Sequence, residues 1–191
     1  MTPQVMTLED YLNHDDETAT RYELIDGMLV EMAPESPINP TIAMFLAIHF
    51  FQQGIPHHCL AIGHEIQVPA QKVTARRPDL VVHSDASAAA ILQDRILRLN
   101  QPVPRLVIEV VSSSDTNQKS RDRDYVHKRE NYAQRGIPEY WIIDPAASIV
   151  LILQLINGAY QEQEFVEHQQ LASPTFPDLQ LTANQVLKAG L

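Results

Sequence analysis

Two acidic residues stand inside apolar stretches of the sequence that are otherwise typical of buried strands. Glu109 is the charged residue of Leu106–Val111, and Asp79 lies near the start of Pro78–His83. A charge in a buried strand costs several kcal/mol unless it is paired or coordinates a metal. We therefore expect a cation, either a side chain or a metal ion, opposite Glu109.

Two carboxylates on adjacent strands could bind a hard divalent cation. The chain between Asp79 and Glu109 is long enough to reverse and pair the two strands. A hard cation prefers oxygen ligands and keeps several waters. It lowers the pKa of a bound water and offsets negative charge in the transition state of phosphate chemistry. A third acid, Glu23, lies in a predicted hairpin and could complete or flank this site.

The sequence also supplies a candidate cation on a predicted helix over Lys119–Arg135. Asp124, Lys128 and Tyr132 are spaced i, i+4, i+8, which places them on one helical face. If that face packs on the sheet, the Lys128 ammonium points at the carboxylates. It could then orient or help deprotonate an attacking water, or stabilise charge on a phosphate.

Each of these residues also has a purely structural reading. Glu109 could be a buried acid paired with Lys128 or Arg77, and Glu23 could be a solvated hairpin residue. Tyr132 is more often a core residue with a satisfied hydroxyl than a catalyst. These alternatives depend on burial, which the sequence alone does not give.

The elements that must position these residues form a mixed sheet. Asp26-Gly27 and Asn157-Gly158 each separate two apolar runs and predict tight hairpins. A strand–helix–strand step in the middle of the chain predicts a right-handed crossover between parallel strands. Apolar spacing predicts a further helix over Ile38–Gln53. Strands are predicted over Cys59–Val68, Pro78–His83, Leu106–Val111 and Tyr140–Asp144.

Bulk properties limit the class of protein. The 191 residues are 45% hydrophobic, which suits a single domain spanning 1–191. The net charge of -10 argues against broad non-specific binding to nucleic acid or anionic membrane. Two local basic groups, Arg76-Arg77 and Lys119-Arg121-Arg123, could either contact phosphates or form a solvated face.

The sequence gives no sign of export or membrane insertion. The N-terminus lacks the layout of a signal peptide, and the longest apolar stretch, Ile42–Phe51, is too short to cross a bilayer. Cys59 is the single cysteine, so we expect neither a disulfide framework nor a cysteine zinc site within the chain. These features predict a soluble cytoplasmic protein.

Five motifs together resemble the Uma2 family, which is abundant in cyanobacteria and is placed in the PD-(D/E)xK, restriction-endonuclease-like superfamily. The resemblance runs from about Leu8 to the C-terminal helix. The motifs are Tyr22-Glu23-Leu24-Ile25-Asp26-Gly27, Pro78-Asp79-Leu80-Val81-Val82, Leu106-Val107-Ile108-Glu109-Val110-Val111-Ser112, Asp124-xxx-Lys128-xxx-Tyr132-xxx-Gly136 and Glu139-Tyr140-Trp141-Ile142-Ile143-Asp144-Pro145.

The resemblance implies an α/β (α+β) fold, with a restriction-endonuclease-like mixed sheet flanked by helices and an N-terminal β-hairpin. It also implies Mg²⁺-dependent (or Mn²⁺-dependent) hydrolysis of phosphodiester bonds in nucleic acid, with DNA as the expected substrate. Asp79 and Glu109 would be the metal ligands and Glu23 an additional acid. The superfamily pattern has a lysine two residues after the second acid, where this chain has Val111. Lys128 would be a migrated catalytic lysine.

Two functions follow from these observations. The first is a metal-dependent endonuclease, expected as a homodimer by analogy with nucleases that cut two strands as pairs. The second is a catalytically inactive binding or regulatory module, indicated by Val111 and the acidic composition. The sequence contains no phosphate loop, nucleophile elbow or dinucleotide fingerprint that would indicate another enzyme class.

Overall fold

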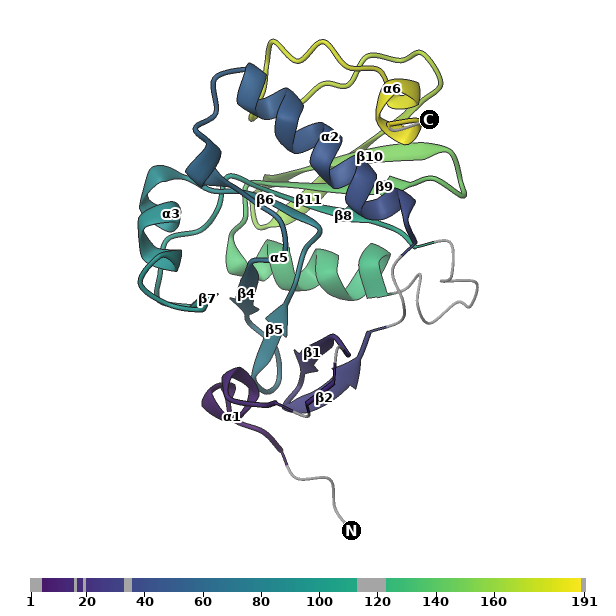
Figure 1. Ribbon diagram of the computed structural model, residues 1–191. Coiled ribbons are helices and arrows are strands. Elements are labelled where there is room, and N and C mark those ends of the chain that lie inside the picture. The colour runs from purple at the N-terminus through teal and green to yellow at the C-terminus, as the bar shows by residue number, and fades with distance from the viewer. Residues whose placement is uncertain (1–4, 16, 19, 33–35, 113–122, 190–191) are drawn as a thin grey trace.

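Two β-sheets and the helices around them make up the chain (Figure 1). The structure is a computed structural model that describes residues 5–15, 17–18, 20–32, 36–112 and 123–189, with the backbone alone at 123 and 124. The larger sheet has the strand order β11-β10-β9-β8-β6-β3. Its strands are β3 (Leu60–Ala61), β6 (Leu80–Val82), β8 (Leu106–Val110), β9 (Glu139–Asp144), β10 (Ile149–Ile156) and β11 (Ala159–Val166).

The predicted crossover lies at the centre of this larger sheet. β8 and β9 are parallel, whereas the other neighbours pair antiparallel, so the sheet is mixed as expected. The connecting helix has a π-helical segment, η2 (Arg123–Lys128), that runs into α5 (Arg129–Arg135). Gly136, with φ of 81°, ends α5 in a left-handed conformation. The predicted helix start at Lys119 lies outside the described residues.

Strand alternation decides which way Glu109 points. In β8, Leu106, Ile108 and Val110 belong to one core cluster with α2 (Ile38–Gln52) and α6 (Ala183–Leu187). Val107 belongs instead to the core cluster of Tyr132, on α5. Figure 1 shows α2 and α6 on one face of the sheet and α5 on the other. Glu109 therefore lies on the face that α5 covers.

The smaller sheet carries the N-terminal hairpin. Its order is β2-β1-β5-β4-β7, with β1 (Tyr22–Ile25), β2 (Met28–Glu31), β4 (Glu65–Val68), β5 (Thr74–Arg76) and β7 (Ile96–Leu97). Asp26 and Gly27 both have positive φ, 48° and 73°, as a type I′ turn requires. Asn157 and Gly158 do the same between β10 and β11. Both predicted hairpins are confirmed.

The single strand predicted over Cys59–Val68 is wrong. The segment divides into a 3-10 turn, η1 (His57–Cys59), then β3 and β4, which belong to different sheets. Gly63 lies between the two strands with φ of 76°, a conformation that glycine tolerates and other residues avoid. A Cβ there would lie 3.0 Å from the Arg77 guanidinium. The bend at Gly63 lets the chain pass from one sheet to the other.

Two short helices complete the described fold. Thr7 caps α1 (Leu8–Leu12) through a capping box. Ser84 caps α3 (Asp85–Ile91) in the same way. Among the helices of the described residues, none is long and apolar enough to cross a membrane.

A buried acid at the start of β9 fastens the C-terminal loop to the larger sheet. The Glu139 carboxylate accepts hydrogen bonds from the Trp141 indole at 2.5 Å, the Ser173 hydroxyl at 2.7 Å and the Thr175 backbone N–H at 2.7 Å. Trp141 itself packs edge-on against Phe50 of α2. Three donors thus offset the cost of burying this charge.

We expect Glu139→Gln to destabilise the fold by about 1–3 kcal/mol, because the amide nitrogen of Gln donates and cannot accept, so a buried donor loses its partner. Urea unfolding followed by Trp141 fluorescence measures the change. Glu164→Gln, at an exposed position of β11, is the matched control and should leave the midpoint unchanged. Equal midpoints for both variants would contradict the role of Glu139.

Candidate active site

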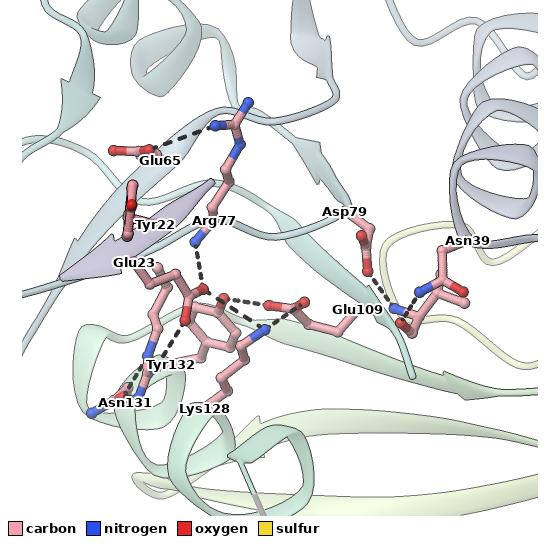
Figure 2. Close-up of polar contacts among 12 residues, drawn as sticks. Tyr22, Glu23, Asn39, Glu65, Arg77, Asp79, Glu109, Lys128, Asn131 and Tyr132 are labelled. Atoms are coloured by element: carbon pink, nitrogen blue, oxygen red, sulfur yellow. Dashed lines mark hydrogen bonds and ion pairs between the residues drawn. The ribbon is translucent and has the colours of Figure 1, made fainter. Parts of the chain in front are cut away.

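The cation opposite Glu109 is Lys128. The Lys128 Nζ lies 2.8 Å from Glu109 Oε2, and both side chains are almost completely buried. The Tyr132 hydroxyl donates to the other carboxylate oxygen, Oε1, at 2.8 Å. Figure 2 shows the lysine and the tyrosine reaching Glu109 from the same helix. The expectation that Lys128 points at the carboxylates is confirmed at Glu109.

Tyr132 is a buried residue with a satisfied hydroxyl, as its structural reading predicted. Burial raises the pKa of Tyr132 well above its ordinary value, and the negative charge of Glu109 raises it further. The hydroxyl therefore remains a proton-bearing donor and holds one oxygen of the Glu109 carboxylate in place. Its role is to orient Glu109.

Glu23 joins the same cluster from the N-terminal hairpin. Its carboxylate accepts hydrogen bonds from Arg76 Nη1 at 3.2 Å and from the Arg77 backbone N–H at 3.1 Å. Its Oε1 lies 3.9 Å from Lys128 Nζ. Glu23 is only 1% exposed, so the reading of a solvated hairpin residue is wrong. The smaller sheet therefore contributes an acid to a site on the larger sheet.

Arg76 has a structural task that the sequence did not reveal. Besides its ion pair with Glu23, it donates from Nε and Nη2 to the Asn131 side-chain oxygen, at 3.1 and 2.9 Å. The Asn131 amide in turn donates to the Pro69 carbonyl at 3.0 Å. Because Arg76 is 3% exposed, it belongs neither to a solvated face nor to a phosphate-binding surface. It fastens α5 to the smaller sheet.

Arg77 differs from its neighbour, because its side chain is 36% exposed. Its Nη1 lies 4.0 Å from Glu65, a carboxyl whose pKa is raised by burial. Figure 2 shows the Arg77 backbone N–H beside Glu23, whereas the partly exposed guanidinium extends away from Glu23 to Glu65. The other predicted basic cluster, at 119, 121 and 123, lies outside the residues whose side chains are described, as does the Asp124 side chain.

Asp79 lies next to Glu109 but outside the lysine cluster. Asp79 directly precedes β6, which begins at Leu80. Because Leu80 pairs with Ile108 in antiparallel register, Asp79 lies level with Glu109 of the neighbouring strand. Its carboxylate is half-buried and accepts a hydrogen bond from the Val110 backbone N–H at 2.6 Å. Asp79 therefore lies beside Glu109 as predicted, one residue before the adjacent strand and not within it. The two carboxylates have different partners, as Figure 2 shows.

Asn39, on the first turn of α2, is a further polar residue at this end of β8. Its side-chain nitrogen donates to the Val110 carbonyl at 2.6 Å. Asp79 accepts from the N–H of the same residue, so the two side chains bind both backbone polar groups of Val110. The Asn39 Oδ1 is buried and has no hydrogen-bond partner among the residues that the structure describes. The one sequence signal was a polar residue at the start of an apolar helix.

Charge and ligand type decide whether a metal ion fits here. The charges of the buried acids Glu23 and Glu109 are balanced by Arg76 and Lys128. These four residues together are neutral, so a metal ion bound among them would leave a net positive charge. Asp79 brings a further negative charge and is open enough to reach solvent. With Glu109 it offers carboxylate oxygens, the ligand type that Mg²⁺ and Mn²⁺ prefer. The residues fit a hard divalent cation.

Comparison with solved structures defines the class of fold. The chain is similar to the crystal structure of "a putative nuclease belonging to DUF820" from Anabaena variabilis, with a TM-score of 0.72 and 17% sequence identity. The match covers 97% of this chain and 99% of that one. The predicted fold, mixed sheets flanked by helices with an N-terminal hairpin, is confirmed.

The chain belongs to the Uma2 family, whose profile, described as "Putative restriction endonuclease", matches residues 8–184. A search of the curated proteins gives no match. The resemblance identified from the motifs is therefore confirmed over nearly the whole chain.

We expect Lys128→Met to destabilise the fold by about 3–5 kcal/mol, because it leaves a buried carboxylate without its cation. Adding Glu109→Gln to Lys128→Met should restore part of that loss, since the uncompensated charge is then gone. Urea unfolding of the single and double variants measures both effects.

Lys188→Met, at an exposed position after α6, is the control and should change stability by no more than about 0.5 kcal/mol. A loss for Lys128→Met as small as that of the control would show that the buried ion pair contributes nothing to the fold.

Proposed function

We propose that this protein is a metal-dependent endonuclease that hydrolyses phosphodiester bonds in DNA. The observation that carries the proposal is the pair of neighbouring acids, Asp79 and Glu109, with the Lys128 ammonium 2.8 Å from Glu109. Acids and a lysine in one place are the groups that phosphodiester hydrolysis uses. Membership of a family described as a restriction endonuclease supports the same reaction.

Each residue has a role in this proposal. Asp79 and Glu109 would hold Mg²⁺ or Mn²⁺, which when bound supplies a Lewis acid and lowers the pKa of a coordinated water. Lys128 would orient the attacking water or stabilise the charge that develops on the phosphate. Glu23, 3.9 Å from the Lys128 ammonium, would hold that lysine in position. Tyr132 fixes the carboxylate of Glu109 through its hydroxyl.

Substrate binding would depend on local groups, because the protein as a whole is acidic. The Arg77 guanidinium, partly exposed beside Glu65, would contact a DNA phosphate. Such a contact positions the backbone without reading the base sequence. The net charge of -10 would keep non-specific binding elsewhere weak.

The alternative function is a catalytically inactive module that binds nucleic acid or regulates a partner. It is favoured by the charge balance of the buried cluster, where Arg76 and Lys128 neutralise Glu23 and Glu109 with no metal ion. Val111, at the position where the superfamily pattern has lysine, points the same way. Metal binding and cleavage together separate the two functions.

We expect the purified chain to cleave DNA only when Mg²⁺ or Mn²⁺ is added, and Asp79→Asn to lower the cleavage rate by at least about 100-fold, because it removes one anionic ligand of the metal. Lys128→Arg keeps the buried charge and should also slow cleavage, since a guanidinium places its protons differently. Supercoiled, linear and single-stranded DNA, with RNA beside them, serve as substrates.

Asp178→Asn, at an exposed aspartate far along the chain, is the control and should cleave as the unmodified protein does. Cleavage that survives Asp79→Asn would indicate a contaminating nuclease. Absence of both cleavage and metal binding, in a chain that is folded by circular dichroism, would favour the inactive module.

We also propose a homodimer that pairs through α2. One face of this helix is buried in the core, and the opposite face exposes Met44, Ile48 and Phe51, each more than half exposed. Their spacing of i, i+4, i+7 forms a single apolar stripe. The same stripe on a second copy could cover it around a two-fold axis.

Light scattering at micromolar protein concentration should give the mass of a dimer, and Met44→Glu combined with Phe51→Glu should give a monomer, because charges would replace the apolar stripe. Gln52→Glu, at a neighbouring exposed position, adds charge beside the stripe and should leave the dimer intact. A monomer in the unmodified protein would contradict the dimer.

A further inference from the structure

A second group of ligand-type residues lies away from the candidate active site. His58, Cys59 and Asp85 each offer one ligand atom, and these atoms all lie within 4.8 Å of one another. Asp79 directly precedes β6, whereas Asp85 lies beyond the other end of that strand, at the start of α3. The group is therefore separate from the acids assigned to DNA cleavage.

Backbone hydrogen bonds fix the two segments that carry these residues. The Cys59 N–H donates to the Pro56 carbonyl at 2.9 Å, which closes the η1 turn. The Cys59 carbonyl accepts from the His83 N–H at 2.7 Å, extending the pairing of β3 with β6. Ser84 caps the N-terminus of α3 and thereby fixes the position of the first helical residue, Asp85. The approach of Cys59 to Asp85 thus follows from the pairing of two strands.

The separation between the ligands suits a tetrahedral metal ion. Cys59 Sγ lies 3.8 Å from the Asp85 Oδ1. In a tetrahedral zinc site, with a metal–sulfur bond of about 2.3 Å and a metal–oxygen bond of about 2.1 Å, the sulfur and the oxygen are about 3.6 Å apart. The two side chains are therefore already spaced almost as a bound ion requires.

We infer that His58, Cys59 and Asp85 form a binding site for a zinc-class divalent cation. Thiolate and imidazole ligands favour Zn²⁺ and Co²⁺ over the Mg²⁺ that the active-site oxygens prefer. Binding forms a metal–sulfur bond in place of the thiol S–H bond, and the proton passes to solvent. Because His58 and Asp85 are exposed, the fourth position is open to a water molecule.

This inference goes beyond the proposed nuclease and differs from the expectation drawn from the sequence. A single cysteine predicted no cysteine zinc site, because the familiar sequence patterns contain several cysteines at fixed spacing. Here a cysteine and its neighbouring histidine meet an aspartate from another element. Only the pairing of β3 with β6 brings the third ligand to the other two.

The test is a Co²⁺ titration of the full-length chain prepared without a histidine tag. We expect a near-ultraviolet absorption from thiolate-to-cobalt charge transfer that saturates at one ion per chain and disappears when Zn²⁺ is added. Oxygen ligands give no such band, so the readout does not depend on the candidate active site or on DNA cleavage. Failure of the nuclease proposal would leave this result unchanged.

Variants assign the ligands. Cys59→Ser should abolish the absorption, and His58→Gln and Asp85→Ala should each weaken Co²⁺ binding by about tenfold or more. His57→Gln is the control and should give the same charge-transfer band as the unmodified protein. No charge-transfer band in the folded unmodified chain, or a band that persists in Cys59→Ser, would overturn the site. His58→Gln replaces an exposed side chain, so its result does not depend on a damaged core.

Discussion

The buried ion pair between Lys128 and Glu109 is the interaction on which the rest of the central structure depends. Because α5 buries the carboxylate in the middle of β8, the same helix must also bring a counter-charge, which is the Lys128 ammonium. The ammonium also lies near Glu23, so the smaller sheet must supply Arg76 as a further counter-charge. One charge in a strand thereby determines how a helix and a second sheet are joined.

Much of this arrangement could be read from local sequence. Glu109 in an apolar run predicted a buried acid with a cation opposite, and the spacing of Lys128 and Tyr132 predicted the helix that provides it. Asp-Gly and Asn-Gly predicted both hairpins, because a type I′ turn needs positive φ at two successive residues. These predictions are correct because each depends on the types and spacing of residues within one short segment.

The features that were missed depend on contacts between distant segments. Nothing local distinguishes Arg76 from Arg77, yet one is buried against Glu23 and Asn131 and the other reaches the surface. The apolar pattern of Cys59–Val68 predicted one strand, but the bend at Gly63 divides it into two strands that pair in different sheets. Asp79 was placed correctly beside Glu109, but its bond to the Val110 backbone follows from strand register.

The two edges of the larger sheet have a consequence for how the protein behaves at high concentration. An uncovered edge strand can pair with another chain and begin aggregation. At one edge, β3 is only two residues long, too short to template a new strand. At the other, the eight-residue β11 carries the exposed acid Glu164, and a like charge on a second copy would repel it. The sheet is therefore protected against growth by strand addition at both sides.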